Sequence, residues 1–321
     1  MQAPERILKG KKVWVAGHTG MVGSALVRRL EDEDIAQLIT APSSSVDLSR
    51  QDETERFVAE NQPDVGIIAA ARVGGINANR NAQADFLYEN LMIAANCLRA
   101  CQMARVEKVA VLGSSCIYPA EASQPMKEEY LLTGPLEATN EGYAVAKIAG
   151  LEYGKMLRRQ YGVDVISLMP TNLYGPGDNY DLETSHVLPA LIRKTHEAKS
   201  TGETILTLWG SGQPRREFLH VDDLADAVIF ALGHYSGEEH LNVGTGTDVS
   251  IMELARIIGG VIGWEGEYEF DRTMPDGVMR KLLDVGKLRD LGWQATIPLA
   301  RGVEMTYQSF LEEQAERSLR S

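Results

Sequence analysis

Residues 12–23 read KVWVAGHTGMVG, and this stretch decides the fold. An apolar run ends at Ala16, glycines follow at positions 17, 20 and 23, and an amphipathic helical pattern continues from Ser24 to Glu33. Glycines leave the backbone bare, so it can approach a diphosphate, and the N-terminus of the next helix directs free N–H groups at the negative charge. The stretch predicts a strand, a turn and a helix that bind a nucleotide, although such turns also occur for structural reasons alone.

Much later in the chain, Tyr143-Ala144-Val145-Ala146-Lys147 places a phenol and an ammonium group four positions apart. On a helix these two side chains share a face, so we expect Lys147 to lower the pKa of the Tyr143 phenol. The glycine turn then binds a nucleotide, and the tyrosine donates a proton. Together they predict an enzyme with a nicotinamide cofactor.

Short apolar runs alternate with helical patterns through the first half of the chain. The expected strands are Val13–Ala16, Gln37–Thr40, Val65–Ala70, Lys108–Leu112 and Asp164–Met169. The expected helices are Ser24–Glu33, Gln51–Asn61, Ala82–Met103 and Ala144–Tyr161. This alternation is typical of βαβ units. We therefore predict the α/β class, with a Rossmann-like, doubly wound parallel sheet.

Beyond Pro170 the pattern of the sequence changes. Ser185–Pro189 opens a further helix after a glycine-rich turn, and short strands then mix with helices. Glu217–Asp223 and Leu241–Gly244 look like returns toward the first domain. We predict that residues 1–174, with a returning segment at about 215–245, form the nucleotide-binding domain. Residues 175–321 would form a smaller, discontinuous α/β lobe for the substrate.

The composition argues against several functions. A net charge of −13 over 321 residues disfavours nucleic-acid binding, and an anionic substrate would need a local cluster of basic residues. No apolar run approaches the roughly 18 residues of a membrane span, and residues 1–12 lack the apolar core of a signal peptide. We expect a cytoplasmic protein without a membrane partner. The three cysteines suggest no disulfide framework, Cys97 and Cys101 are expected in the core, and no metal site is predicted.

Two serines and a cysteine follow the fourth strand, in Leu112-Gly113-Ser114-Ser115-Cys116. Ligands of such sheets bind outside the carboxyl ends of the strands, so these side chains should reach the reaction centre. Taken alone, two serines at a strand end are turn residues more often than catalytic ones. Because Tyr143 and Lys147 are also present, we interpret Ser114 or Ser115 as a donor to a substrate carbonyl oxygen.

The chain resembles the GDP-L-fucose synthases, epimerase/reductases of the extended short-chain dehydrogenase/reductase superfamily that act on GDP-4-keto-6-deoxy-D-mannose. The glycine spacing is that of the extended members and differs from G-x-G-x-x-G. The resemblance spans nearly the whole chain, through Gly17–Gly23, Ala71–Ile76, Gly113–Pro119, Asn140–Tyr143, Met169–Pro176, Asn179 with Ser185–Val187, Trp209–Gly212, Arg216–Asp223 and Lys281–Val285. The glycine and Tyr/Lys motifs mark only the superfamily, whereas the Ser-Ser-Cys and Ser-His-Val segments are more specific.

The resemblance implies epimerisation at C3 and C5 of the sugar, then reduction of the C4 ketone. Cys116 and His186 resemble the acid/base pair that exchanges the protons beside the ketone. A thiol with a pKa of about 8.5 and an imidazole with a pKa of about 6.5 both exchange protons near neutral pH. The alternatives are a buried apolar cysteine and a solvent-exposed histidine at a helix start. Tyr143 would protonate the new hydroxyl, and Lys147 would hold the nicotinamide ribose.

The resemblance also assigns two sets of ligand contacts. The nicotinamide cofactor would contact Gly17, His18, Thr19, Gly20, Met21, Val22, Gly23, Asp47, Leu48, Leu112, Gly113, Ser114, Ser115, Tyr143, Lys147, Pro170, Thr171, Asn172, Leu173 and His186. The GDP-sugar would contact Lys194, Trp209, Arg216 and Asp276. Lys194 and Arg216 would meet the diphosphate, Trp209 the guanine, and Asp276 the ribose or guanine. The alternatives are surface charges, a core tryptophan and an ordinary Pro-Asp-Gly turn.

At the adenine end the chain departs from its relatives. NADP-using members carry arginines in the glycine loop and after the second strand, where this chain has Thr19 and Thr40–Ser45. The acidic residue with which NAD enzymes often bind the 2′-hydroxyl is also missing. Serine hydroxyls can receive a 2′-phosphate, with Arg28, Arg29 or Arg50 nearby. We expect NADPH, with a modest preference over NADH, and a homodimer.

Three other interpretations of the same motifs are compared with this one. The 4,6-dehydratases carry an Asp-Glu pair where this chain has Ser115 and Cys116, which argues against dehydration. A reductase or epimerase for another GDP-4-keto-6-deoxy sugar, as in GDP-colitose formation, fits the same motifs. A catalytically inactive nucleotide-binding protein with this fold would typically lack the tyrosine or the lysine of the motif, and here both Tyr143 and Lys147 are present.

Overall fold

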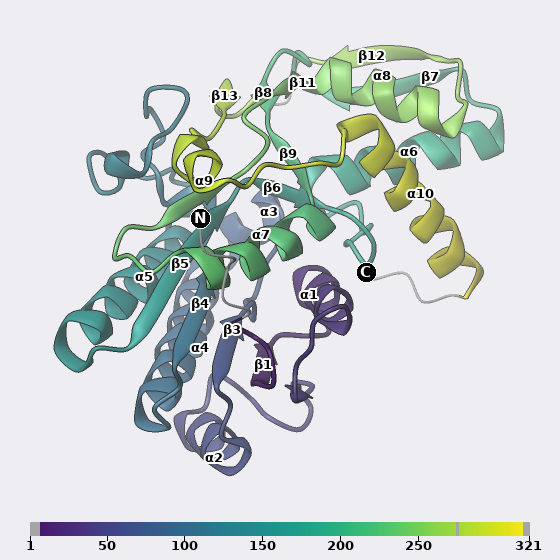
Figure 1. Ribbon diagram of the computed structural model, residues 1–321. Helices are drawn as coiled ribbons and strands as arrows, with labels where there is room; N and C mark the ends of the chain where they lie inside the picture. Colours follow the sequence, from purple (N-terminus) through teal and green to yellow (C-terminus); the bar gives the residue numbers. More distant parts are fainter. Residues whose placement is uncertain (1–6, 274–275, 317–321) are drawn as a thin grey trace.

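A six-stranded parallel sheet organises the larger part of the molecule (Figure 1), whose computed structural model describes residues 7–273 and 276–316. In spatial order its strands are β10 (Leu241–Val243), β5 (Asp164–Pro170), β4 (Lys108–Leu112), β3 (Val65–Ile68), β1 (Lys12–Ala16) and β2 (Gln37–Ile39). The central strands are buried on both faces, which accounts for their nearly continuous Val, Ile and Leu content. The predicted Rossmann-like α/β fold is confirmed.

Helices cover both faces of this sheet (Figure 1). One face carries α2 (Gln51–Asn61), α4 (Gln83–Met103) and α5 (Glu141–Tyr161), and the other carries α1 (Met21–Glu31) and α7 (Val221–His234). Cys97 and Cys101 of α4 are fully buried in the core beside Trp14, as predicted. Among the described helices, none combines the length and apolarity that a membrane span needs.

Several element boundaries differ from the prediction. Helix α1 begins at Met21, because Gly20 is extended and serves as its N-cap. Helix α5 begins at Glu141, so Tyr143 lies in its first turn. Strand β3 ends at Ile68, although the Ala69 N–H still donates to the Ala16 carbonyl at 3.0 Å. The short helix α3 (Ile76–Asn81) was not predicted, because six residues are too few to show a helical hydrophobic period.

A second core forms where three helices pack on a parallel strand pair. The helices are α6 (Val187–Thr201), α8 (Ile251–Ile262) and α10 (Leu299–Ala315), and the strands are β7 (Ile205–Trp209) and β12 (Glu267–Asp271). Helix α8 begins with a capping box, in which Ser250 and Glu253 satisfy each other's free N–H groups. Leu191, Ile258 and Phe310 meet in this core.

Short strands join the two cores. Strand β6 (Asn172–Tyr174) pairs with β9 (Phe218–His220), and β11 (Val249–Ser250), β8 (Arg215–Arg216) and β13 (Arg280–Lys281) form a small sheet. After β9 the chain returns through α7 to β10, and α9 (Gly286–Leu291) packs against β10. The chain thus passes between the two cores more than once, and the division near residue 174 stays a prediction.

Candidate active site

The glycine turn lies where the strand order of the sheet reverses. Strand β1 has β2 on one side and β3 on the other, so the carboxyl ends of β1 and β3 mark the switch point at which doubly wound sheets bind ligands. Gly17 has a φ of +84°, and a Cβ there would lie 2.6 Å from the Cα of Ala70 after β3. Nδ1 of His18 is buried, and no partner for it occurs in the described part of the chain. This bare turn at the N-terminus of α1 fits the diphosphate of a nicotinamide dinucleotide.

The predicted nicotinamide segments lie beside each other at the ends of β4 and β5. The Gly113 N–H donates to the Leu168 carbonyl at 2.8 Å, and the Thr171 N–H donates to the Val243 carbonyl at 3.0 Å. The Asn172 amide donates to the Glu217 carbonyl at 2.8 Å. These bonds hold the loops after β4, β5 and β10 at one edge of the sheet.

Tyr143 and Lys147 share a face of α5, as predicted. The Lys147 ammonium lies 5.6 Å from the centre of the Tyr143 ring and donates to the Leu112 carbonyl at 2.9 Å. Burial lowers the pKa of Lys147 to about 8. The expected net lowering of the phenol pKa is wrong for this structure: burial, followed by the Cys116 thiol, raises the pKa of Tyr143 above its ordinary value. The phenol therefore keeps its proton, as a proton donor must.

Ser114 and Cys116 belong to the turn after β4. Oγ of Ser114 accepts from the Cys116 N–H at 3.4 Å and begins a short 3₁₀ helix, Ser115–Ile117. Cys116 is 8 % exposed, and burial raises the pKa of its thiol, whereas the Ser114 bond and the charges of Lys281 and Lys147 lower it. Cys116 thus lies among Tyr143, Lys147 and Lys281.

His186 belongs to the other core, and the chain before it packs against the segment after β3. It is the N-cap residue of α6, and the chain just before it is fixed by the Gly75 N–H, which donates to the Thr184 carbonyl at 2.7 Å. The Phe86 ring, which lies beside Gly74, is edge-on to Tyr143, with 6.4 Å between ring centres. The imidazole keeps an exposed surface, yet enough protein surrounds it that burial lowers its pKa. Both Cys116 and His186 therefore favour their uncharged forms.

A buried network fixes the segment that follows Cys116. The Tyr118 hydroxyl donates to Oδ1 of Asn242 at 2.5 Å, and its oxygen lies 2.9 Å from Nε2 of His240. Because the Tyr118 proton is directed at Asn242, Nε2 of His240 is the donor of the second bond. The Asn242 amide also donates to the carbonyls of Met126 and Asp284. The Cys116 turn is thereby tied to the end of β10.

The buried His240 predicts a pH dependence of stability. Burial lowers its pKa to about 4, from an ordinary value of 6.5. Between these values the unfolded chain binds more protons than the folded chain, so the free energy of unfolding falls as the pH is lowered. We expect His240 to account for a loss of about 2 kcal/mol between pH 7 and pH 5, measured by urea unfolding.

A matched pair of variants isolates this effect. His240→Gln should lose less stability between the two pH values than the parent chain does. His234→Gln, at the exposed end of α7, should keep the full loss. Equal losses in the parent and both variants would contradict the assignment to His240.

The four predicted substrate residues lie close to one another around the loops after β7 and before β13. The Lys194 ammonium lies 5.6 Å from the centre of the Trp209 ring, and Trp209 is 55 % exposed, so it does not fill the core. The Asp276 carboxylate accepts from the N–H and hydroxyl of Ser211 at 2.6 and 2.8 Å, which places it beside Trp209. Arg216 lies beside the same turn: a Cβ added to Gly277 would be 3.8 Å from Nη2 of Arg216. Pro275 of the predicted turn lies outside the described residues.

Two further residues were not singled out from the sequence. Lys281 lies beside Arg216 in the β8–β13 pair, and Ser211 holds Asp276. The sequence did contain a signal for Lys281, because the chain is acidic overall and yet carries two dibasic pairs, Arg215-Arg216 and Arg280-Lys281. Arg215 and Arg280 are paired with Asp248, so Arg216 and Lys281 remain as the local basic cluster that an anionic substrate needs.

The arginines near the adenine end are largely engaged. Arg28 forms an ion pair with Asp222 at 2.6 Å, and Arg29 pairs with Asp226 at 3.0 Å and with Glu33 at 2.8 Å. The exposed Arg50 lies at a longer 3.4 Å from Glu53. Asp47 is held by Ser49, and the Leu48 carbonyl accepts from the Asn96 amide. Ser43–Ser45 are exposed.

Comparison with known proteins agrees with this geometry. Residues 13–244 match the NAD dependent epimerase/dehydratase family. The GDP-L-fucose synthase of Sinorhizobium fredii is 51 % identical over 98 % of this chain and 99 % of its own. The GDP-L-colitose synthase of Yersinia pseudotuberculosis is 36 % identical over 94 % of this chain and 98 % of its own. A crystal structure of a GDP-L-fucose synthetase from Naegleria fowleri bound to NADP has a TM-score of 0.89 at 28 % identity, and the match covers 98 % of each chain.

The glycine turn at the switch point, the Tyr143–Lys147 pair and these matches agree, and the chain belongs to the NAD dependent epimerase/dehydratase family and, within it, to the group of the GDP-L-fucose synthases.

Proposed function

We propose that this chain catalyses the GDP-L-fucose synthase reaction. It would epimerise GDP-4-keto-6-deoxy-D-mannose at C3 and C5 and then reduce the C4 ketone with NADPH. The observation that carries the proposal is the grouping of Ser114, Cys116, Tyr143 and Lys147 after β4, at the same carboxyl edge of the sheet as the glycine turn. Adding the keto sugar to the chain with NADPH should lower the nicotinamide absorbance, and no change would contradict the proposal.

The first step is proton exchange beside the ketone. Removal of a proton from C3 or C5 leaves negative charge that spreads onto the C4 oxygen, where the Ser114 and Tyr143 hydroxyls can donate hydrogen bonds. One of Cys116 and His186 takes the proton, and the other returns one on the opposite face. The net proton count is unchanged, and the configuration of the carbon is inverted. A second round inverts the other carbon.

The second step is reduction at C4. A bound reduced nicotinamide supplies the hydride for this step. Tyr143 retains its proton at neutral pH because burial raises its pKa, and it donates that proton to the C4 oxygen. The phenolate left behind is stabilised by the Lys147 ammonium over the same ring. Lys147 is also the residue that we expect to hold the nicotinamide ribose.

A second candidate substrate is another GDP-4-keto-6-deoxy sugar. The similarity to the GDP-L-colitose synthase favours this alternative, because that relative also matches nearly the whole chain. NMR of the product separates the two candidates, since a 3-deoxy substrate yields a 3-deoxy product. Comparison of kcat/KM for the two keto sugars then identifies the preferred substrate.

We expect a modest preference for NADPH over NADH. Arg28 and Arg29 are paired with carboxylates, so the exposed Arg50 and the Ser43–Ser45 hydroxyls remain for a 2′-phosphate. An exposed ion pair contributes about 0.2–1 kcal/mol, and tenfold in affinity is about 1.4 kcal/mol. The ratio of kcat/KM values should therefore favour NADPH by less than about tenfold.

Two substitutions test the origin of this preference. Arg50→Gln should reduce it, whereas Arg28→Gln, which removes an arginine already paired with Asp222, should not. A higher kcat/KM with NADH than with NADPH in the parent chain would overturn the cofactor assignment.

Two broader expectations also stand as proposals. We propose that two copies of the chain form a homodimer, and exposed apolar side chains on α4 and α5, Tyr88 and Met156, support a contact there. Light scattering after size-exclusion chromatography measures the assembly. We further propose that the protein works in the cytoplasm, which fractionation of cells that express it can test.

A further inference from the structure

The turn that contains Cys116 is held only weakly by its own hydrogen bonds. It is a single 3₁₀ turn, Ser115–Ile117, which follows Ser114 and ends at Tyr118. Its three bonds span 3.3–3.5 Å between nitrogen and oxygen, and one of them runs from the Cys116 N–H to Oγ of Ser114. Such bonds in proteins usually span about 2.7–3.2 Å. The direction of the Cys116 side chain is therefore set by contacts outside the turn.

One external contact precedes the turn, and a second group of contacts follows it. Before the turn, the Gly113 N–H donates to the Leu168 carbonyl at 2.8 Å. After it, the Tyr118 hydroxyl donates to Oδ1 of Asn242 at 2.5 Å and accepts from Nε2 of His240 at 2.9 Å. Tyr118 is only 3 % exposed, so water does not compete for these bonds. Because the external bonds are the shorter ones, the turn takes its position from them.

Asn242, the partner of Tyr118, is fully buried, and each polar group of its side chain is engaged. Its amide donates to the Met126 carbonyl at 2.9 Å and to the Asp284 carbonyl at 3.0 Å. Its backbone N–H donates to the Glu128 carboxylate at 3.1 Å. Since the two amide protons are used, Oδ1 is the atom that receives the Tyr118 proton. Asn242 cannot turn without breaking several bonds, and it is a fixed partner for Tyr118.

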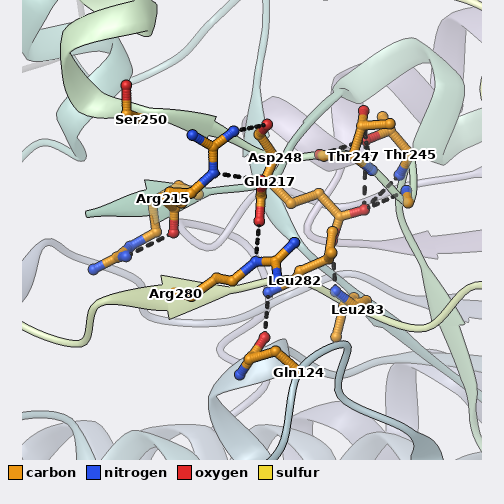
Figure 2. A network of polar contacts seen from close by, with 12 residues as sticks. Gln124, Arg215, Glu217, Thr245, Thr247, Asp248, Ser250, Arg280, Leu282 and Leu283 are labelled. Carbon is orange, nitrogen blue, oxygen red and sulfur yellow. Dashed lines mark hydrogen bonds and ion pairs between the residues drawn. The ribbon is translucent and has the colours of Figure 1, made fainter. Parts of the chain in front are cut away.

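The segments that surround Asn242 are joined to each other. Oε1 of Gln124 accepts from the Leu282 N–H at 2.8 Å (Figure 2), and the Met126 N–H donates to the Leu282 carbonyl at 2.7 Å. The Asp284 N–H donates in turn to the Met126 carbonyl at 2.8 Å. The Tyr118 hydroxyl therefore connects the Cys116 turn to a continuously bonded part of the fold.

We propose that Tyr118 is a positioning residue for proton exchange, and that its bond to Asn242 directs the Cys116 thiol at the sugar. This inference rests on the proposed function, in which Cys116 transfers a proton at C3 or C5. Displacing a reacting group by about 1 Å can cost about 100-fold in rate. Loss of the Tyr118 hydroxyl should therefore slow the exchange, whereas binding of the GDP-sugar, which we assign to other residues, should persist.

Tyr118→Phe tests this role, because the ring stays in its apolar cluster with Ile117 and Leu283 and only the hydroxyl is lost. With NADP in place of NADPH, hydride transfer is blocked, and NMR in heavy water follows deuterium exchange into the keto sugar alone. At saturating keto sugar, exchange should be slowed about 10- to 100-fold. The sugar concentration for half-maximal exchange should change by no more than about twofold, because only the chemical step is affected. The loss should fall on the carbon or carbons that Cys116→Ser affects.

Tyr268→Phe is the matched control. The Tyr268 hydroxyl also donates a short bond, to the Ala255 carbonyl at 2.6 Å, but it lies in the second core. Its loss removes a comparable internal hydrogen bond and should leave exchange at the parent rate. Urea unfolding should show that both variants are folded under the assay conditions. His240→Gln, which leaves the Tyr118–Asn242 bond in place, should also exchange at close to the parent rate.

Exchange at the parent rate in Tyr118→Phe would overturn the role of Tyr118. An equal loss in Tyr268→Phe or in His240→Gln would overturn it too, and so would a loss that weaker sugar binding explains. A parent chain that neither exchanges deuterium nor oxidises NADPH with the keto sugar would overturn the proposed function, and the role of Tyr118 with it.

Discussion

Tyr143→Phe should slow hydride transfer by about 10²- to 10⁴-fold, the usual cost of losing a general acid, while GDP and NADPH still bind. The substitution removes the only proton that the ring can give and leaves its contact with Phe86 in place. Because burial raises the pKa of Tyr143, the parent phenol is protonated at neutral pH, and the loss should be nearly constant between pH 6 and pH 8. Single-turnover oxidation of NADPH measures it.

Tyr161→Phe provides the comparison. Tyr161 lies at the end of α5 and is 55 % exposed, so the loss of its hydroxyl should leave the rate unchanged. If Tyr143→Phe oxidises NADPH at the parent rate, Tyr143 has no part in proton donation.

Cys116→Ser and His186→Asn should each abolish exchange of solvent deuterium at C3, at C5 or at both. A serine hydroxyl has a pKa several units above that of a thiol and is a poor base near neutral pH. Asparagine cannot exchange a proton as the imidazole does, but it retains a hydrogen-bond donor. Both variants should bind GDP and NADPH and yield little GDP-L-fucose, with some C4-reduced, unepimerised product. NMR in heavy water measures the exchange.

His196→Asn serves as a control on the same helix as the His186 cap. The His196 ring lies 2.9 Å from the Tyr307 hydroxyl, in the second core, and its loss should leave exchange intact. Normal exchange at both carbons in Cys116→Ser and in His186→Asn would show that neither residue transfers protons to or from the sugar.

The elements that the sequence predicted well are those with a local signal. Gln51–Asn61 and Lys108–Leu112 have the predicted bounds, and the glycine turn lies between β1 and α1, because spacing and apolar runs are properties of neighbouring residues. The Tyr143–Lys147 face follows from helical geometry in the same way.

What the sequence could not provide depends on the tertiary structure. Strands β8 and β13 have two residues each, too few for any period, so the pairing of Arg216 with Lys281 could not be predicted. The direction of the Tyr143 pKa was predicted wrongly because burial outweighs the nearby ammonium, and burial depends on segments far apart in the chain. The ion pairs that Arg28 and Arg29 form with carboxylates of α7 could not be predicted either, because they depend on the packing of α1 against α7.

The most direct test of combined epimerisation and reduction is a single incubation in heavy water. The chain, NADPH and GDP-4-keto-6-deoxy-D-mannose are mixed, and the product is examined by NMR. The expected product is GDP-L-fucose with deuterium at C3 and C5 and ordinary hydrogen from NADPH at C4. A product reduced at C4 that retains the original configuration and carries no deuterium at C3 and C5 would contradict the proposed function.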